Sequence, residues 1–211
     1  MLTIFLSPKG GSGTTTVAAA HALANADTHG RAVLIDMCGD APAALGMVES
    51  DGPGLNDWLA ESQSAGPDDL IALGHATGGL LVVHRGTRFV SGAPRWQALI
   101  AALAQWDHPV VIDAGTHYIP DELRAAADNV LLVTRQCYLA LRRATSMPAP
   151  TGVVVVKEDS RALTVKDVEN VLGVPVVVTI PVDPSIARAI DAGVLPQRHA
   201  ELFSRHIAPV T

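Results

Sequence analysis

Glycines, hydroxyl residues and one lysine are concentrated in the stretch SPKGGSGTTT, at residues 7–16. An apolar run at residues 2–6 precedes this stretch, and a helical pattern begins at Thr14. Glycines let the backbone turn several N–H groups toward one point, and the following helix adds its positive end, so the stretch predicts a phosphate-binding loop. The hydroxyl of Thr15 stands where such a loop supplies a ligand to Mg²⁺. The residues expected around the phosphate are Lys9, Gly10, Gly11, Ser12, Gly13, Thr14, Thr15 and Thr16.

The composition narrows the class of protein. With 211 residues the chain is long enough for one domain, residues 1–211, with a sizeable core. The net charge of −6 does not favour a protein that binds polyanions over its whole surface. No apolar run reaches the roughly 18 residues of a membrane span, and the N-terminal run is too short for a signal peptide. Cys38 and Cys137 are too few for a disulfide framework, so we expect a cytoplasmic protein.

Seven runs have the length of strands and are apolar throughout rather than alternating. This pattern is typical of parallel strands that are buried on both faces. Helical stretches lie between most of the runs. The sequence therefore predicts a doubly wound α/β fold, with a mostly parallel sheet of seven or eight strands and helices on both faces. The strands are expected at residues 2–6, 32–36, 80–83, 110–113, 130–134, 152–157 and 174–180. The helices are expected at 14–28, 95–105, 121–127, 139–146, 164–172 and 184–192, with one or two short helices around 56–60 and 68–73.

The glycine loop resembles a known family signature. PKGGSGTTT is similar to the deviant Walker A motif of the ParA/MinD ATPases, which implies a P-loop NTPase fold of the SIMIBI type. By this resemblance, Lys9 is the signature lysine that reaches across a dimer to the partner's nucleotide. Thr14 replaces a second lysine, which contacts the β- and γ-phosphates of its own nucleotide. The TadZ/CpaE-like branch, associated with pilus positioning and polar localisation, often shows this loss, and residues 39–47 and 54–61 resemble that branch.

The resemblance continues along the chain and implies a magnesium site. Asp36 ends the stretch AVLID and stands in the place of the family's Mg²⁺-side aspartate, while Asp113 in PVVID resembles the Walker B aspartate. The family commonly has a second aspartate that aids the attack of water; Cys38 occupies its place, and Asp40 is the nearest substitute. The catalytic candidates are therefore Lys9, Asp36 and Asp40, and the candidate metal ligands are Thr15, Asp36 and Asp113.

A late stretch of the chain resembles the base-binding loop of the same family. TIPVDPSIARAIDAG, at residues 179–193, matches the segment whose backbone reads adenine, and it assigns the base contacts to Pro181, Val182 and Asp183. One strand earlier the family often carries an asparagine near the base, and Lys157 occupies that place here. The implied cofactor is ATP or ADP, with Mg²⁺ when the nucleotide is bound.

The replacement of the second lysine by Thr14 determines how much nucleotide binding and ATP hydrolysis we expect. A charge-assisted hydrogen bond contributes roughly 1.5–3 kcal/mol, or about 10- to 100-fold in affinity. Binding would survive this loss better than catalysis, so hydrolysis is expected to be very slow or absent. The resemblance then implies a homodimeric, nucleotide-binding scaffold that positions an unknown protein partner, at a pole or on the nucleoid. Two alternatives stay open: an active ParA/MinD-type ATPase that cycles on DNA or membrane, and a nucleotide-free protein-binding module.

Several residues also have a plainer interpretation. Lys9 suits a solvated surface position, and Asp36 and Asp113 suit helix capping. Arg142 and Arg143 suit nonspecific DNA binding, although the acidic balance favours a solvated helix face. The tail at 199–211 is comparable with the MinD membrane helix in its apolar residues, but it has few basic residues and a proline near its end, so membrane anchoring is not favoured.

Overall fold

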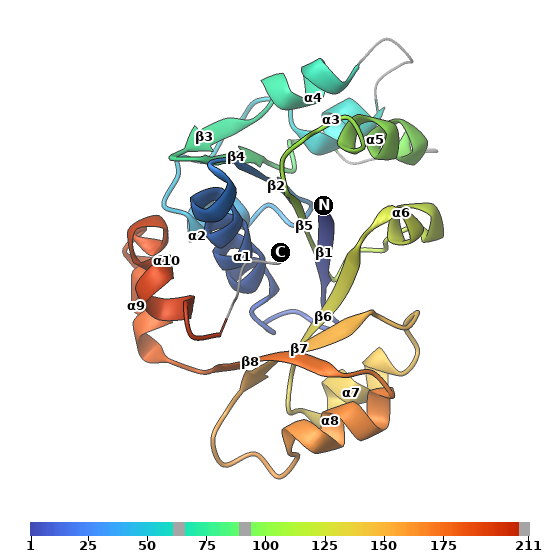
Figure 1. Cartoon of the computed structure of the whole chain (residues 1–211), viewed down its shortest axis with the longest axis vertical. Coiled ribbons are helices and arrows are strands. Elements are labelled where there is room, and N and C mark those ends of the chain that lie inside the picture. Colours follow the sequence, from blue (N-terminus) through green and yellow to red (C-terminus); the bar gives the residue numbers. More distant parts are fainter. Residues whose placement is uncertain (61–65, 89–93, 207–211) are drawn as a thin grey trace.

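An eight-stranded sheet runs through the middle of the molecule (Figure 1). The computed structural model describes residues 1–60, 66–88 and 94–206. The strands are β1 (Leu2–Leu6), β2 (Ala32–Asp36), β3 (His75–Thr77), β4 (Leu80–Val83), β5 (Val110–Gly115), β6 (Asn129–Arg135), β7 (Gly152–Lys157) and β8 (Val176–Pro181). They lie in the order β3-β4-β2-β5-β1-β6-β7-β8, and every neighbouring pair is parallel except β3 with β4. The predicted mostly parallel sheet is confirmed.

Helices cover both faces of this sheet, as the alternating sequence pattern predicts. They are α1 (Thr14–His29), α2 (Ala41–Ala44), α3 (Leu55–Ala60), α4 (Pro67–Ala72), α5 (Trp96–Leu103), α6 (Asp121–Ala126), α7 (Tyr138–Ala144), α8 (Val165–Leu172), α9 (Pro184–Asp191) and α10 (Leu195–Phe203). In Figure 1, α1, α2, α9 and α10 lie on one side of the sheet, and α5, α6, α7 and α8 lie on the other. The doubly wound architecture is therefore confirmed as well.

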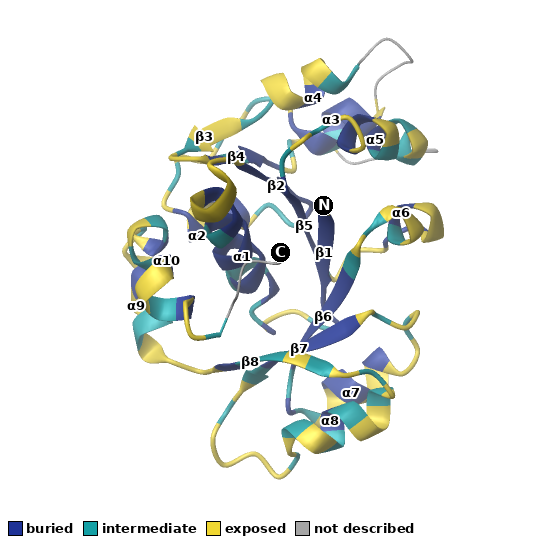
Figure 2. Cartoon of the chain, viewed as in Figure 1, coloured by how far each residue is buried: buried dark blue, intermediate teal, exposed yellow. Residues whose placement is uncertain are grey.

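Each strand except β3 contributes to two separate cores, because successive side chains point to opposite faces of a sheet. In β1, Phe5 belongs to the core beneath α1, and Ile4 belongs to the core on the opposite face. The first core is rich in alanines of α1, such as Ala18 and Ala22, which let the helix backbone approach the sheet closely. Figure 2 shows the central strands buried along their length, which explains why their sequences are apolar throughout.

Three short or late elements lie where no regular structure was predicted, namely α2, β3 and α10. The strand β3 pairs antiparallel with β4 across a turn at Gly78, whose φ of +59° favours glycine. The residues of β3 are exposed or half-buried, so the strand carries no apolar signal. The helix α2 has four residues, too few for a helical period to appear.

The helix α10 gives the C-terminal segment a structural role. Phe203 is buried in the core that α1 covers, and Leu202 packs against the same core. Nε2 of His199 lies 2.9 Å from a carboxylate oxygen of Asp27 on α1. The tail is comparable with a membrane helix through its apolar residues Leu202, Phe203 and Ile207. Leu202 and Phe203 pack inside the protein, while Ile207 lies outside the described residues. Within residues 1–60, 66–88 and 94–206, no helix is long and apolar enough to cross a membrane.

The start of α9 has the local chemistry that the sequence predicts. The carboxylate of Asp183 accepts a 2.7 Å hydrogen bond from the backbone N–H of Ser185, and Pro184 occupies the first turn. Gly193 follows the helix with a φ of +66°. Because the cap begins the helix at Pro184, the segment from Pro181 to Asp183 is held at the carboxyl end of β8.

Candidate functional site

The glycine loop connects the carboxyl end of β1 to the first turn of α1. Gly11 and Gly13 have φ values of +75° and +90°, a backbone conformation that other residues rarely adopt. The carbonyl oxygen of Lys9 accepts hydrogen bonds from the hydroxyls of Ser7 and Ser12, at 2.7 and 3.0 Å. The loop is thus held by its own side chains, and the N-terminus of a sixteen-residue helix points at its centre.

A cavity of 360 Å³ opens over this loop. Its walls come from the loop itself, from the segment after β2 and from the segment after β5. The lining residues are Ser7, Lys9, Gly10, Gly11, Ser12, Gly13, Thr14, Thr15, Thr16, Cys38, Asp40, Gly115, Thr116 and His117. All eight residues predicted to surround a phosphate therefore line one cavity.

Two carboxylates lie side by side behind the wall of this cavity, next to Cys38, although neither is among its lining residues. Asp36 ends β2, Asp113 is its register partner in β5, and both are fully buried. Oδ1 of Asp36 accepts 2.8 Å hydrogen bonds from the backbone N–H groups of Cys38 and Gly39, and Oδ2 accepts one of 3.0 Å from Ala41. Burial raises the pKa of Asp36, although these three N–H groups act in the opposite direction. The plainer interpretation of Asp36 as a capping residue is thus partly correct, since these hydrogen bonds shape the loop after β2.

Asp113 has an oxygen that the protein does not satisfy. Its Oδ1 accepts a hydrogen bond of 3.1 Å from the N–H of Gly115, whereas Oδ2 is buried and meets no hydrogen-bond partner among the described residues. Burial raises the pKa of this carboxyl to about 6, while the hydroxyl of Thr15 acts to lower it. An orphaned, buried carboxylate oxygen next to a hydroxyl is a suitable place for a cation.

Cys38 stands where the resemblance expects a second carboxylate, and Asp40 is the nearest substitute for it. The thiol of Cys38 faces the cavity and contacts the carbonyl oxygen of Asp113 at 3.7 Å. Burial and the nearby acidic groups Asp113, Asp36 and Asp40 raise the pKa of this thiol, so it stays protonated in the absence of a cation. Asp40 also lines the cavity but is exposed at the start of α2.

Lys9 lies at the rim of the cavity. Its Nζ donates a 3.1 Å hydrogen bond to the carbonyl oxygen of the next residue, Gly10, and the side chain is half-buried. Thr14, where the resemblance expects the second lysine, is buried and lines the cavity wall. Among the described lining residues, Lys9 is the one lysine near the loop.

A second cavity, of 170 Å³, continues from the first, because Gly13 and Thr16 line both. It lies between the ends of β7 and β8 and the first turns of α9. Pro181, Val182 and Asp183 line it, together with apolar side chains such as Ile180. The structure therefore brings the predicted base-side residues next to the glycine loop, although they are about 170 positions later in the chain.

Sequence reasoning missed Arg135, which lines this second cavity. Arg135 ends β6, and its Nη1 donates a 2.5 Å hydrogen bond to Glu158, while its buried Nε meets no partner in the described part of the chain. Lys157, the residue that the sequence places near the base, is exposed and does not line the cavity. Arg135 directly follows the predicted strand at 130–134, and this position at a strand end is the signal that could have found it.

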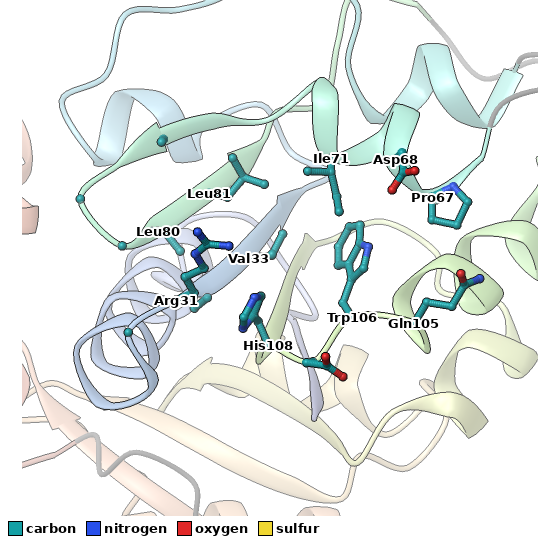
Figure 3. Close-up of a pocket in the computed structure, with 16 residues that line it drawn as sticks. Arg31, Val33, Pro67, Asp68, Ile71, Leu80, Leu81, Gln105, Trp106 and His108 are labelled. Carbon is teal, nitrogen blue, oxygen red and sulfur yellow. The ribbon is translucent and has the colours of Figure 1, made fainter.

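A larger cavity, of 690 Å³, lies at the opposite edge of the sheet (Figure 3). It is lined by the amino ends of β2 and β4, by α4 and by the segment before β5. Figure 3 shows Trp106 and Ile71 on one side, and Arg31 and His108 on the other. Its lining includes none of the predicted site residues, so the larger volume does not mark the predicted site.

The fold and the loop define a class of protein: an α/β nucleotide-binding domain with its phosphate loop between β1 and α1. The chain belongs to the CobQ/CobB/MinD/ParA nucleotide-binding domain family, because the sequence model of that family matches residues 3–196. No curated protein sequence matches the chain.

Solved structures with the same fold come from this family. A ParA family ATPase from Chlorobium tepidum superposes with a TM-score of 0.78 at 20% identity, over 97% of this chain and 92% of that one. MinD from Pyrococcus horikoshii, complexed with Mg-ADP, gives a TM-score of 0.69 at 19% identity, over 95% and 88%. The MinC:MinD complex from Aquifex aeolicus gives 0.67 at 15%, over 100% and 98%. At these identities the likeness concerns the fold.

Proposed function

We propose that the protein is a ParA/MinD-type, nucleotide-binding positioning protein of the TadZ/CpaE-like branch, with weak or absent ATP hydrolysis. It acts in the cytoplasm, at a pole or on the nucleoid, as a homodimer that recruits a protein partner. The observation that carries this proposal is the pair of contiguous cavities around Gly13 and Thr16. One is lined by a glycine loop at a helix N-terminus, and the other by apolar side chains, as a phosphate group and a base would require.

Mg²⁺ fits between the first cavity, which Thr15 lines, and the two carboxylates behind its wall. The Thr15 hydroxyl, the orphaned Oδ2 of Asp113 and the remaining lone pair of Asp36 are oxygen donors of the kind that Mg²⁺ takes. When bound, the ion would neutralise charge on the phosphates. The residues of the chain would orient the nucleotide, through the loop N–H groups, and hold the base against Pro181 and Val182.

Weak hydrolysis follows from two replacements at the cavity wall. Thr14 cannot place a positive charge against the phosphates, and Cys38 cannot activate water as a carboxylate would. Asp40 is the nearest free carboxylate, and it is exposed. Catalysis depends on charge stabilised in the transition state, so these losses affect turnover more than binding.

Nucleotide binding should raise the melting temperature of the protein. At a ligand concentration of 100 times Kd, Mg-ATP or Mg-ADP should add about 2.7 kcal/mol to the free energy of unfolding. For a chain of this size this corresponds to a rise of roughly 5 to 11 °C, measured by differential scanning calorimetry. No rise with millimolar Mg-ATP, Mg-ADP or Mg-GTP would favour the alternative of an empty loop.

Two glycine variants form a matched pair for this measurement. Gly11 and Gly30 have φ values of +75° and +77°, and a Cβ at either position would meet nothing within 4 Å. Gly11→Ala and Gly30→Ala should therefore lose similar stability, but Gly11 lies in the loop and Gly30 at the far end of α1. The nucleotide-induced rise should shrink in Gly11→Ala alone. Fast turnover that Asp40→Ala abolishes would instead favour the active ATPase.

The dimer gives Lys9 its role in this proposal. Its Nζ is bonded to the rim of its own loop rather than directed at the loop centre, which leaves it available to a partner's phosphates. Two copies facing each other across the cavities would shield the ion pair from water, where it is strongest. The wild-type protein should then be a dimer with Mg-ATP, and Lys9→Ala should shift it toward monomer and weaken ATP binding.

Multi-angle light scattering with and without nucleotide measures this shift. Lys166→Ala is the control, because Lys166 is an exposed lysine on α8. A wild-type protein that stays monomeric with saturating Mg-ATP, or a Lys9→Ala variant that dimerises equally well, would show that Lys9 is a solvated surface residue.

A further inference from the structure

A thiol that lines the glycine-loop cavity lies beside two buried carboxylates. Sγ of Cys38 and carboxylate oxygens of Asp36 and Asp113 all lie within 4.8 Å of one another. The thiol can occupy this place because residue 115 is a glycine, where a Cβ would come within 2.3 Å of Sγ. Three potential metal ligands from the ends of two neighbouring strands therefore converge on one point.

The hydrogen bonds around this point leave both carboxylates able to bind a cation. Oδ2 of Asp36 accepts one N–H, from Ala41, and keeps a second lone pair. Oδ2 of Asp113 is buried and makes no hydrogen bond of ordinary geometry to the described residues, although the hydroxyl of Thr15 and the thiol of Cys38 lie near enough to this carboxyl to lower its pKa. Leaving such an atom unsatisfied is unfavourable, and a bound cation would remove that penalty. The unsatisfied oxygen of Asp113 therefore indicates a bound ligand, and this observation is independent of the thiol.

His117 adds a nitrogen donor at the edge of the cluster. Its Nδ1 lies 3.9 Å from Sγ of Cys38 and 3.2 Å from the carbonyl oxygen of Ala114. A sulfur and a nitrogen bound to the same tetrahedral zinc lie about 3.6 Å apart. His117 is not among the atoms that lie within 4.8 Å of one another, so its exposed imidazole ring would have to move toward the carboxylates to complete a set of four ligands.

We propose that Cys38, Asp36 and Asp113 bind a divalent transition-metal ion of the zinc or cobalt class, with His117 as the fourth ligand. Mg²⁺ takes oxygen ligands, whereas a thiolate selects softer ions. When the ion binds, the S–H bond of Cys38 breaks, the sulfur keeps the electron pair and coordinates the metal, and the proton leaves to the solvent. Asp36 and Asp113 are also the carboxylates that would hold Mg²⁺ beside a nucleotide, so the two ions are alternatives at this place, and the inference requires no bound nucleotide.

Cobalt is the probe that tests this site, because its absorption reports directly on a bond to sulfur. Untagged, metal-free protein is titrated with Co²⁺ alone. The wild-type protein should bind one equivalent and develop a strong near-ultraviolet band from charge transfer between thiolate and cobalt. Zn²⁺ should displace the ion and abolish the band, whereas a large excess of Mg²⁺ should not.

The two cysteines of the chain provide a matched pair of variants. Cys38→Ser should lose the charge-transfer band, and Cys137→Ser, which changes the residue before α7, should keep it. Asp113→Asn should weaken Co²⁺ binding by at least the roughly 10- to 100-fold lost when an outer-shell group of a metal site is removed. Its thiol is intact, so this variant tests the site independently of how well Cys38→Ser folds.

Three results would overturn the inference: no band in the wild-type protein, a band that survives in Cys38→Ser, or displacement of Co²⁺ by an equal concentration of Mg²⁺. The melting experiment with Mg-nucleotide is separate. A failed cobalt titration therefore leaves the proposed nucleotide binding intact, and a missing nucleotide effect leaves the metal site intact.

Discussion

Replacing Thr14 with lysine should tighten Mg-ATP binding by roughly 10- to 100-fold. Thr14 is buried at the first position of α1 and lines the glycine-loop cavity, so a lysine there has its stem in the wall and its ammonium in the cavity. A charge-assisted hydrogen bond to phosphate contributes roughly 1.5–3 kcal/mol, which corresponds to this change in affinity. Isothermal titration calorimetry of wild type and Thr14→Lys measures it.

The matched control is Thr14→Met, which adds a side chain of similar length without a charge. An equal gain in Thr14→Met would show that apolar packing, rather than charge, tightens binding. No gain in Thr14→Lys would mean that position 14 does not face the phosphates. Turnover of Thr14→Lys should stay slow, because Cys38 still stands where a carboxylate would activate water.

A change of His21 should remove a large part of the acid sensitivity of the protein. His21 is 4% exposed on the inner face of α1, where its ring meets Phe5 edge to face at 5.3 Å. Its Nε2 has no hydrogen-bond partner within the described ranges, and burial lowers the pKa of the imidazole to about 4. The native protein therefore holds this ring neutral at a pH where the unfolded chain protonates it.

The direction of the effect follows from proton binding in the two states. Between pH 6.5 and about 4 the unfolded chain binds a proton at His21 and the folded protein does not, so the free energy of unfolding falls as the pH falls. From pH 7 to pH 5 this group should remove about 2 kcal/mol. Asp113 acts in the opposite direction, because its pKa is raised to about 6, but it contributes equally to wild type and variant.

Urea unfolding of His21→Leu and wild type at pH 7 and pH 5 isolates this contribution. The loss of stability on acidification should be about 2 kcal/mol smaller in His21→Leu. His29→Leu is the control, since His29 is exposed on the last turn of the same helix and its removal should leave the pH dependence unchanged. Equal slopes for wild type and His21→Leu would show that the ring is protonated in the native state.

The local features of this protein follow from its sequence. Three glycines between an apolar run and a helical pattern predict the phosphate loop, and Gly11 and Gly13 indeed have positive φ values that favour glycine. The cap at Asp183 and the apolar strands are also predictable, because their causes act within a few residues or recur with a simple period. The short strand β3 and the helix α2 are not, since neither carries an apolar period.

The tertiary structure alone decides which distant residues share the site. Asp36 and Asp113 become register partners because β2 and β5 are neighbours in the sheet, and no local pattern states that neighbourhood. The same packing places the thiol of Cys38 over Gly115 and brings Arg135, instead of Lys157, to the cavity beside the loop. Strand order is determined by the burial of two opposite faces at once, a property of the whole sheet rather than of any segment.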